Sequence, residues 1–377
     1  MIPFNKPYFT GQELSFIKQA VDSGKISGNG IFTKKCQSYF EENYSFQKCL
    51  LTQSCTDALE MAAILCNVQP GDEVIIPSFT FVSTANAFAL RGAKIVFVDS
   101  ESNHPNLDAD KIECLITPRT KVIVPVHYAG NACKMPEIIE LAEKHNLFVV
   151  EDAAQAFDSF HIDKSGNKRP LGSFGHLSTF SFHETKNIIS GEGGMLVIND
   201  PHMADRAEII WEKGTNRSAF FRGEVDKYGW VDIGSSFLPS EVTSAFLFAQ
   251  LQNSNEIQQR RIHIWNVYHE LLKKWATDNN VKQNQVPLHS TNNAHMYYLI
   301  FDTQESRNRF IEELKRKGVH TVFHYQSLHK SRFIGDSHKF CENSDRYSEC
   351  LVRLPVYAGL TDVELEHIIS SIQEIQI

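Results

Sequence analysis

The sequence predicts an α/β protein with two parts: a large domain built around a mostly parallel sheet, and a smaller α+β domain at the C-terminal end. The chain has 377 residues, which is too many for one hydrophobic core. Its middle alternates short apolar runs with segments of helical periodicity, a pattern typical of a parallel sheet covered by helices on both faces. Long helical segments follow from about residue 240. We therefore predict a large domain at residues 1–245 and a small domain at 246–377.

The elements of the large domain are predicted from this alternation. Short apolar runs rich in Val and Ile predict buried strands, and apolar residues at helical spacing predict helices. In chain order these are a helix at 56–67, a strand at 73–77, a helix at 84–90, strands at 94–98 and 121–126, a helix at 135–145 and a strand at 147–151.

The small domain is predicted from a different pattern. Residues 241–276 are helical with clusters of charge, and two strand-like runs, 297–301 and 319–325, flank a helix around 305–317. Two polar segments, at 160–171 and 282–293, are short, so we predict loops there and no disordered linker.

Composition excludes several classes of protein. The formal net charge of −8 disfavours nucleic-acid binding, because phosphate backbones demand a basic surface. No apolar stretch approaches the length of a membrane span, and Pro3, Lys6 and Pro7 interrupt the run that a signal peptide would need. The eight cysteines include no CxxC pair, so we expect reduced thiols, no disulfide or metal site, and a cytoplasmic location.

Polar residues just beyond the strands are candidates for a site, because ligands of parallel α/β sheets bind at the carboxyl ends of the strands. Asp152 follows the run LFVVE, and His127 follows KVIVPV. The Asp152 carboxylate can pair with a ring nitrogen of a cofactor, or it can cap a helix that starts at AAQA. Gln155 follows at a spacing that brings it over the same site, or it is an ordinary polar helix residue.

Lys186 lies in a predicted turn between the strand-like FSF at 180–182 and the glycine-rich GEGG at 191–194. A lysine in a partly desolvated pocket has a lowered pKa, and its neutral amine can form an imine. On this segment alone, a surface lysine beside a glycine-rich hairpin is the better interpretation. The HETKN segment lacks the second histidine of HExxH, which excludes a zinc protease.

A phosphate site is predicted where Ser54, Cys55 and Thr56 precede an amphipathic helix. Free amides and the dipole at a helix start attract anions, and hydroxyl groups add donors. A plain N-cap is the alternative. A nucleophilic thiol at Cys55 has little support, because nothing nearby in the sequence supplies a base.

The other candidates are an aromatic residue and several polar ones. Phe81 shares one side of an extended segment with Phe79 and can stack on a flat ring, although core packing is the commoner role of a phenylalanine. The polar candidates either bind substrate hydroxyls and anions or are ordinary surface residues: Asn5, Lys25, His324, Tyr325 and His329.

The order of these features is more specific than any one of them. A phosphate-binding helix start, an aromatic residue, a strand-end carboxylate, an imine-forming lysine and a glycine-rich turn are together what pyridoxal phosphate (PLP) requires. A nicotinamide dehydrogenase is disfavoured, because no GxGxxG follows an early strand.

The same segments resemble the DegT/DnrJ/EryC1 family of sugar aminotransferases, which are PLP enzymes of fold type I. The similarity runs from NKPYFTGQE at 5–13 to RLPVY at 353–357, and it includes SCTDALEMAA, NLFVVEDAAQ, SFHETKN and GEGG. It implies that Lys186 holds the cofactor as a Schiff base and carries the proton, that Asp152 pairs with the pyridinium nitrogen, and that Phe81 stacks on the ring.

The resemblance also assigns the remaining cofactor contacts. Gln155 would contact the side of the ring that carries the hydroxyl group. Cys55 and Thr56 would bind the phosphate mainly through their backbone, and Ser181 would add a hydroxyl. Many relatives have Gly at the position of Cys55. Many also have Asn at the position of Ser236, where the side chain reaches the cofactor phosphate of the partner subunit.

The resemblance implies a reaction and an assembly. Glutamate would donate its amino group to the C4 keto group of dTDP-4-keto-6-deoxy-D-glucose, which gives dTDP-4-amino-4,6-dideoxy-D-galactose for enterobacterial common antigen or another surface polysaccharide. The enzyme would be a homodimer with shared active sites. A 3-keto or UDP-linked sugar is an alternative acceptor. A PLP-dependent sugar dehydratase is a further alternative, disfavoured because such relatives have histidine in place of the Schiff-base lysine.

Overall fold

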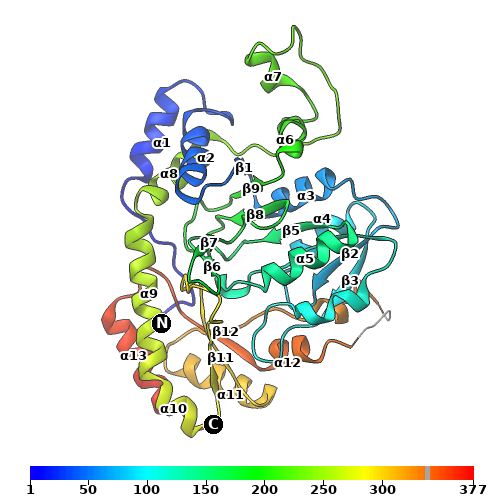
Figure 1. Ribbon diagram of the computed structural model, residues 1–377. Coiled ribbons are helices and arrows are strands. Elements are labelled where there is room, and N and C mark those ends of the chain that lie inside the picture. Colours follow the sequence, from blue (N-terminus) through cyan, green and yellow to red (C-terminus); the bar gives the residue numbers. More distant parts are fainter. Residues whose placement is uncertain (336–339) are drawn as a thin grey trace.

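The computed structural model describes residues 1–335 and 340–377. In this part of the chain, the main sheet has seven strands in the order β1-β9-β8-β5-β4-β2-β3 (Figure 1). These are β1 (Lys48–Thr52), β2 (Glu73–Pro77), β3 (Lys94–Val98), β4 (Thr120–Ile123), β5 (Phe148–Asp152), β8 (Leu177–Ser181) and β9 (Gly194–Ile198). Strand β9 pairs antiparallel with β1 and β8, and the other pairs are parallel, so the predicted mostly parallel sheet is confirmed.

Helices cover both faces of this sheet, which explains why its strands are apolar runs without polar alternation. Side chains alternate between the faces along a strand. Val74 and Ile76 therefore pack on one face, with α3 (Cys55–Leu65) and α4 (Val82–Ala89). Ile75 packs on the other face, with α5 (Met135–His145).

The small sheet lies at the other end of the molecule (Figure 1). Within the described residues it has four antiparallel strands in the order β10-β11-β13-β12. They are β10 (Lys282–Gln283), β11 (Tyr297–Ile300), β12 (Val322–Phe323) and β13 (Leu351–Leu354). The helices of this region are α9 (Ser254–Leu271), α10 (Lys273–Asp278), α11 (Gln304–Arg316), α12 (Glu342–Cys350) and α13 (Asp362–Gln373).

The predicted boundary at residue 245 falls inside helix α8 (Glu241–Gln252). Ala245 packs with Ala20 of α1 (Glu13–Asp22) and Phe32 of α2 (Ile31–Tyr44). Helix α8 therefore runs continuously across that position, and the division into domains at 245 stays a prediction.

Several local predictions differ from the structure. The strand expected at 121–126 ends at Ile123 of β4. The strand expected at 319–325 is reduced to the two residues of β12. The loop expected at 160–171 contains a hairpin of β6 (Phe160–Ile162) and β7 (Lys168–Pro170), because the Asp163 carboxylate accepts hydrogen bonds from the Ser165 and Asn167 amides and closes the turn. The loop expected at 282–293 begins with β10, which pairs with β11.

His127, which the sequence singles out at a strand end, has a structural partner. Its Nε2 lies 2.9 Å from Oε2 of Glu151, and both side chains are fully buried. Its Nδ1 accepts a hydrogen bond from the Cys133 amide. His127 thus holds the loop after β4 against β5.

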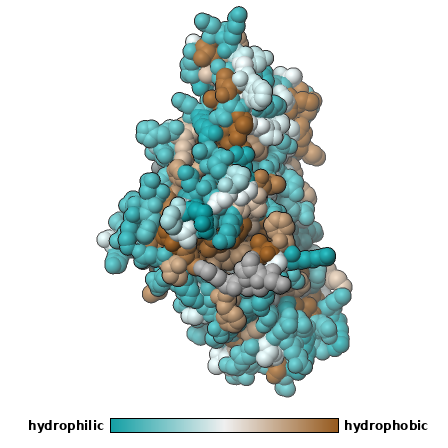
Figure 2. All heavy atoms as spheres, turned by 90° about the vertical axis from the view of Figure 1, so that its right-hand side faces the viewer, coloured by the Kyte–Doolittle hydropathy of each residue, from teal (hydrophilic) through white to brown (hydrophobic). Residues whose placement is uncertain are grey.

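An arm projects from the body after helix α6 (Ala204–Trp211), and it contains the short helix α7 (Arg217–Phe221) (Figure 1). Large apolar side chains are exposed there, including Phe221, Tyr228 and Trp230. Apolar surface is visible among hydrophilic residues at this end in Figure 2. No helix among the described residues combines the length and the apolar character that a membrane crossing requires.

Candidate active site

A cavity of about 560 Å³ lies at the carboxyl ends of the main strands. Its wall joins the two sheets: Asp152 and Ser181 end β5 and β8, while Arg353 comes from β13. The start of α3 and the turn that carries Lys186 complete it. This is the edge at which parallel α/β sheets bind ligands.

Lys186 is positioned by a turn that folds back on itself. The Phe182 amide donates to the Gly193 carbonyl and the Glu184 amide to the Gly191 carbonyl, so the glycine-rich segment pairs with the segment that precedes the lysine. The Lys186 side chain lines the cavity, and among the described residues its ammonium has no hydrogen bond or ion pair. Burial lowers its pKa, although Cys55 and Asp152 oppose this effect. An amine that is easily deprotonated and faces a cavity can form an imine, and a surface lysine does not fit this geometry.

Asp152 is a buried carboxylate that faces the same cavity. The Thr84 hydroxyl donates to Oδ2 at 2.7 Å, and the Ala154 amide donates to Oδ1 at 3.2 Å. Burial raises its pKa. Residues 153–159 form turns and no helix, so the alternative role as a helix cap has no helix to cap. A buried carboxylate with two fixed donors is suited to hold a cationic ring nitrogen.

Gln155 and Phe81 both line the cavity, and they come from two separate segments of the chain. The Gln155 Oε1 accepts the Ala129 amide at 2.7 Å, and its Nε2 donates to the Tyr325 hydroxyl at 3.1 Å. Phe81 precedes α4 and is 55% exposed, with its ring 6.1 Å from that of Tyr325. Phe79 is buried and packs in the core, whereas the exposed ring of Phe81 is free to stack on a ligand.

The start of α3 provides an anion site. Ser54 is the N-cap, and its hydroxyl accepts the Asp57 amide at 3.1 Å, as the capping alternative has it. The Cys55 and Thr56 amides belong to the first turn and have no acceptor within the helix. Gly194 packs so closely here that a Cβ would overlap the backbone of Ser54 and Cys55. Burial raises the pKa of the Cys55 thiol, which disfavours a nucleophilic thiolate.

These groups fit PLP. The cavity offers an unpaired amine for the aldehyde, a buried carboxylate for the pyridine nitrogen, and a helix start for the phosphate. Ser181 lies beside them at the end of β8. Each of these residues is a candidate from the sequence alone, but their convergence is a result of the fold.

The predicted substrate and interface residues divide into two groups. Asn5, His324 and Tyr325 line the cavity, with Asn5 Nδ2 donating to the Glu184 carbonyl and His324 Nδ1 at 2.7 Å from the Tyr128 hydroxyl. The second group lies outside the cavity.

In that second group, Lys25 is exposed and donates to the Asn29 carbonyl at 2.7 Å. His329 is buried, with Nδ1 2.6 Å from the Ser78 hydroxyl, so it holds the loop after β2. Ser236 is exposed, and its carbonyl accepts a hydrogen bond from Gln53. The structure therefore gives Lys25 and His329 no place in this cavity, and a contact of Ser236 with a partner subunit stays a prediction.

Among the polar residues of the cavity wall that the sequence prediction omits, Thr84 and Arg353 stand out. Thr84 fixes Asp152, and Arg353 contributes a cation to the cavity. Thr84 looks like any helical threonine in sequence. Arg353 has a recognisable signal, because it is a charge within the apolar run LVRLPVY.

His183 gives a test of the dehydratase alternative, because it lies three residues from Lys186. Its Nδ1 is 2.9 Å from the Thr185 hydroxyl, and its Nε2 is 3.7 Å from the Glu192 carboxylate. An imidazole cannot form the imine, and the lysine occupies the cavity beside Asp152. The geometry thus favours transamination.

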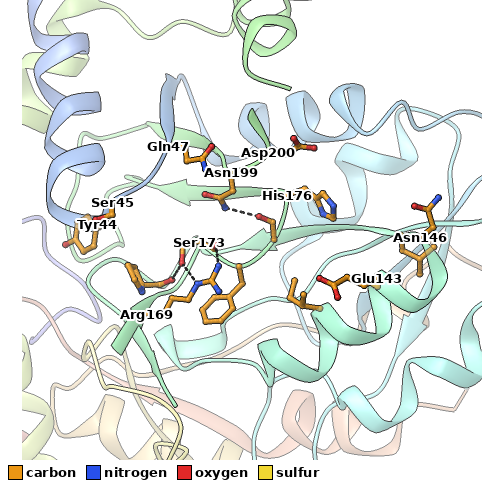
Figure 3. A pocket seen from close by; sticks show the side chains of 16 residues that line it. Tyr44, Ser45, Gln47, Glu143, Asn146, Arg169, Ser173, His176, Asn199 and Asp200 are labelled. Carbon is orange, nitrogen blue, oxygen red and sulfur yellow. Dashed lines mark hydrogen bonds between the residues drawn. The ribbon is translucent and has the colours of Figure 1, made fainter. Parts of the chain in front are cut away.

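A second cavity, of about 750 Å³, is shown in Figure 3. It lies near the amino ends of β5 and β8, away from the edge where ligands of such sheets bind. Its arginine, Arg169, already donates to the Ser173 hydroxyl and carbonyl and stacks on Phe174. Its size alone does not make it the site.

The fold and the cavity define the class of protein: a PLP-dependent transferase of fold type I. The chain belongs to the DegT/DnrJ/EryC1/StrS aminotransferase family, whose model matches residues 7–373. It is accordingly a PLP-dependent sugar aminotransferase, which takes an amino donor and a nucleotide keto-sugar.

Individual relatives agree with this membership. GDP-perosamine synthase from Escherichia coli O157:H7 is 30% identical over 99% of this chain and 98% of its own. The crystal structure of the aminotransferase TlmJ from Streptoalloteichus hindustanus superposes with a TM-score of 0.89 at 29% identity, over 99% and 98% of the two chains. Spr1654 from Streptococcus pneumoniae, described as a sugar aminotransferase and solved in its PMP form, gives a TM-score of 0.90 at 25% identity over 99% and 98%.

Proposed function

We propose that this enzyme transfers the amino group of glutamate to C4 of dTDP-4-keto-6-deoxy-D-glucose, giving dTDP-4-amino-4,6-dideoxy-D-galactose and 2-oxoglutarate. The observation that supports transamination is the pair of Lys186 and Asp152 facing one cavity beside the start of α3. The choice of sugar rests on the similarity of SCTDALEMAA, SFHETKN and EKGTNRSAFFRG to the transaminases that make this product.

The proposed roles follow from the positions of the side chains. PLP supplies a ring that withdraws electrons from the carbon that carries the amine. Asp152 holds the ring nitrogen in its protonated form, and the Cys55 and Thr56 amides bind the phosphate. Lys186 would hold the cofactor covalently, and its neutral amine would move a proton at the reacting carbon.

Purified protein with PLP and glutamate should aminate dTDP-4-keto-6-deoxy-D-glucose at C4. The reaction should release one 2-oxoglutarate for each amino sugar, and NMR of the product should give the position and configuration of the amine. A panel with UDP-linked, GDP-linked and 3-keto sugars provides the comparison. Failure to aminate every member of the panel would contradict the proposal, and preference for another member would overturn the choice of sugar.

A GDP-linked keto-sugar is the second candidate acceptor. It is favoured by one observation, the 30% identity to a GDP-perosamine synthase over nearly the whole of both chains. Competition between the dTDP-linked and GDP-linked sugars in one assay separates the two candidates.

We also propose that the enzyme acts as a homodimer, in the cytoplasm. The projecting arm supports the dimer, because it exposes Trp230 (83%), Phe221 (69%) and Tyr228 (53%) close together in the chain. Large apolar side chains that are exposed together on one segment indicate an interaction site. Ser236 follows the arm, where it is available to a second subunit.

Trp230→Ser is expected to shift the protein from dimer to monomer in sedimentation velocity at micromolar concentration. The change removes a large apolar side chain of the kind that dominates interfaces. Leu288→Ser is the matched control, because Leu288 is 99% exposed in another part of the chain. A wild-type protein that sediments as a monomer at every concentration would contradict the dimer.

A further inference from the structure

His295 presents an unpaired ring nitrogen at the cavity. It lies just before β11, lines the cavity wall and is 8% exposed. Its Nε2 has no hydrogen-bond partner among the described residues, and solvent reaches this atom. What His295 can bind therefore depends on which of its two ring nitrogens carries the proton.

The tautomer of His295 is fixed by hydrogen bonds that begin at a backbone carbonyl. The Asn293 carbonyl can only accept, so the atom of Asn187 that lies 2.8 Å from it is the amide nitrogen, Nδ2. Asn187 then directs its Oδ1 at His295 Nδ1, at 2.8 Å. Because this oxygen also can only accept, Nδ1 carries the proton of the neutral ring. The lone pair is consequently on Nε2, and Nε2 is a hydrogen-bond acceptor.

The ring is also kept neutral and in place. Burial lowers the pKa of His295 well below its ordinary value, and the charge of Lys186 adds to this effect. The main chain is held as well, because Arg261 donates to the His295 carbonyl at 2.7 Å and the His295 amide donates to Asn293 Oδ1 at 3.0 Å. His295 is thus an acceptor whose position is set before any ligand binds.

Among the described residues that line the cavity, His324 is the other buried imidazole, and it lacks this constraint. Its Nδ1 lies 2.7 Å from the Tyr128 hydroxyl, which can donate or accept, so either tautomer satisfies the contact. The fixed acceptor at His295 indicates a ligand that supplies an O–H or N–H donor.

The chemistry of the proposed substrates limits that donor. The carboxylates of glutamate accept hydrogen bonds, and its amine is required at the cofactor. In the keto-sugar, C4 is bonded to C3, which carries a hydroxyl, and to C5, which carries the methyl group and the ring oxygen. The reacting C4 must lie next to Lys186, and His295 is anchored to Asn187, the next residue in the chain. These positions favour the C3 hydroxyl as the donor to Nε2.

We propose that His295 Nε2 accepts a hydrogen bond from the C3 hydroxyl of the keto-sugar and thereby selects acceptors with a hydroxyl next to the reacting carbonyl. This inference rests on the proposed function, because it concerns the sugar of that reaction. It applies equally to a GDP-linked 4-keto-6-deoxy sugar that carries this hydroxyl. A 3-deoxy sugar would displace water from Nε2 and leave it without a partner, which weakens binding.

The test compares sugars with and without this hydroxyl in the full-length holoenzyme. Rapid mixing of the PMP form with dTDP-4-keto-6-deoxy-D-glucose and with its 3-deoxy analogue gives two second-order rate constants. In wild type the analogue should react about 30-fold more slowly, the loss typical of a buried polar group left without its partner. Mixing of the PLP form with L-glutamate follows the other half of the reaction, which should change by less than about 3-fold in each variant.

Two variants separate the acceptor atom from its anchor. His295→Asn keeps a donor to Asn187 but has no acceptor at the position of Nε2, so the ratio between the two sugars should fall below about 3. His295→Gln places an amide oxygen near that position and should keep most of the ratio. His320→Asn is the matched control, because His320 is exposed and does not line the cavity.

A wild-type ratio near 1, or an unchanged ratio in His295→Asn, would overturn the inference. Equal losses with glutamate and with the sugar in His295→Asn would also overturn it, because Nε2 would then serve the amine of Lys186. The wild-type ratio requires no variant, so it judges the inference even if a melting curve shows that His295→Asn is misfolded.

Calorimetric titration provides a readout without turnover. The ligands are dTDP-6-deoxy-D-glucose and its 3-deoxy analogue, which have no carbonyl, and their affinities for wild type should also differ about 30-fold. If wild type aminates no sugar while this difference holds, the proposed function fails and the role of His295 stands. If wild type aminates the keto-sugar while the two affinities are equal, the role of His295 fails alone. Binding of neither ligand and no amination would overturn both.

Discussion

Lys186→Ala is expected to reduce transamination about 10⁴-fold, because the change removes both the covalent attachment of the cofactor and the amine that carries the proton. Borohydride should fix PLP to Lys186 in the wild type, and mass spectrometry should find the adduct on the peptide that contains SFHETKN. The variant should give no adduct and should lose the visible absorption band of the lysine-bound cofactor.

Lys164→Ala is the matched control, because Lys164 is exposed in the turn between β6 and β7. It should keep the adduct, the absorption band and the activity. An adduct or band that persists in Lys186→Ala would show that another lysine holds the cofactor. Methylamine added to Lys186→Ala should restore part of the proton transfer if the lost group is an amine base.

Asp152→Asn is expected to lower the turnover number about 10²–10³-fold, as is typical when one preorganised electrostatic partner of a reacting system is removed. An amide is nearly the same size, but it has no negative charge to keep the ring nitrogen protonated. Steady-state kinetics should show the lower turnover number. A titration with PLP should show a higher dissociation constant for the cofactor.

The same Asp152→Asn change should not lower the stability of the cofactor-free protein. Burial raises the pKa of the Asp152 carboxyl, so the ionised form is less favourable in the folded chain than in the unfolded one. This penalty is absent below the pKa of the unfolded chain, grows as the pH rises from that pKa to the pKa of the folded chain, and is fully present above it. At neutral pH, apo Asp152→Asn should therefore melt at or above the wild-type temperature.

The same melting experiment discriminates a role in binding PLP from a role in folding. Added PLP should raise the melting temperature of Asp152→Asn less than that of the wild type, because a ligand stabilises the folded state in proportion to its affinity. If the apo variant melts well below the apo wild type, Asp152 supports the fold and its assignment to the cofactor is wrong.

Much of the fold follows from local patterns that the sequence displays. Strands β2 and β3 have the predicted bounds, and β5 is displaced by one residue, because apolar runs buried on both faces of a parallel sheet leave a clear signal. Prediction from hydrophobic periodicity fails where hydrogen bonds of a side chain determine the local structure. The Asp163 turn converts a polar loop into a hairpin, and 153–159 form turns where the residue types favour a helix.

The site residues divide in the same way. Lys186, Asp152 and the start of α3 were accessible from the sequence, since each combines a reactive or capping residue type with the end of a predicted element. The sequence alone left each with an ordinary alternative. Burial of Asp152, the exposed ring of Phe81 and the unpaired Lys186 ammonium are the observations that bear on these alternatives, and they are properties of packing between distant segments.

The sequence by itself determined the α/β class, the strand ends that carry Asp152 and Lys186, and the resemblance that implies PLP, because these depend on residue type and short-range order. Only the tertiary structure placed Arg353 of β13 in the same cavity as Lys186, set Thr84 against Asp152, and placed Lys25 and His329 outside that cavity. The physical reason is that burial and the pairing of charges are set by residues far apart in the chain, whose approach no local pattern encodes.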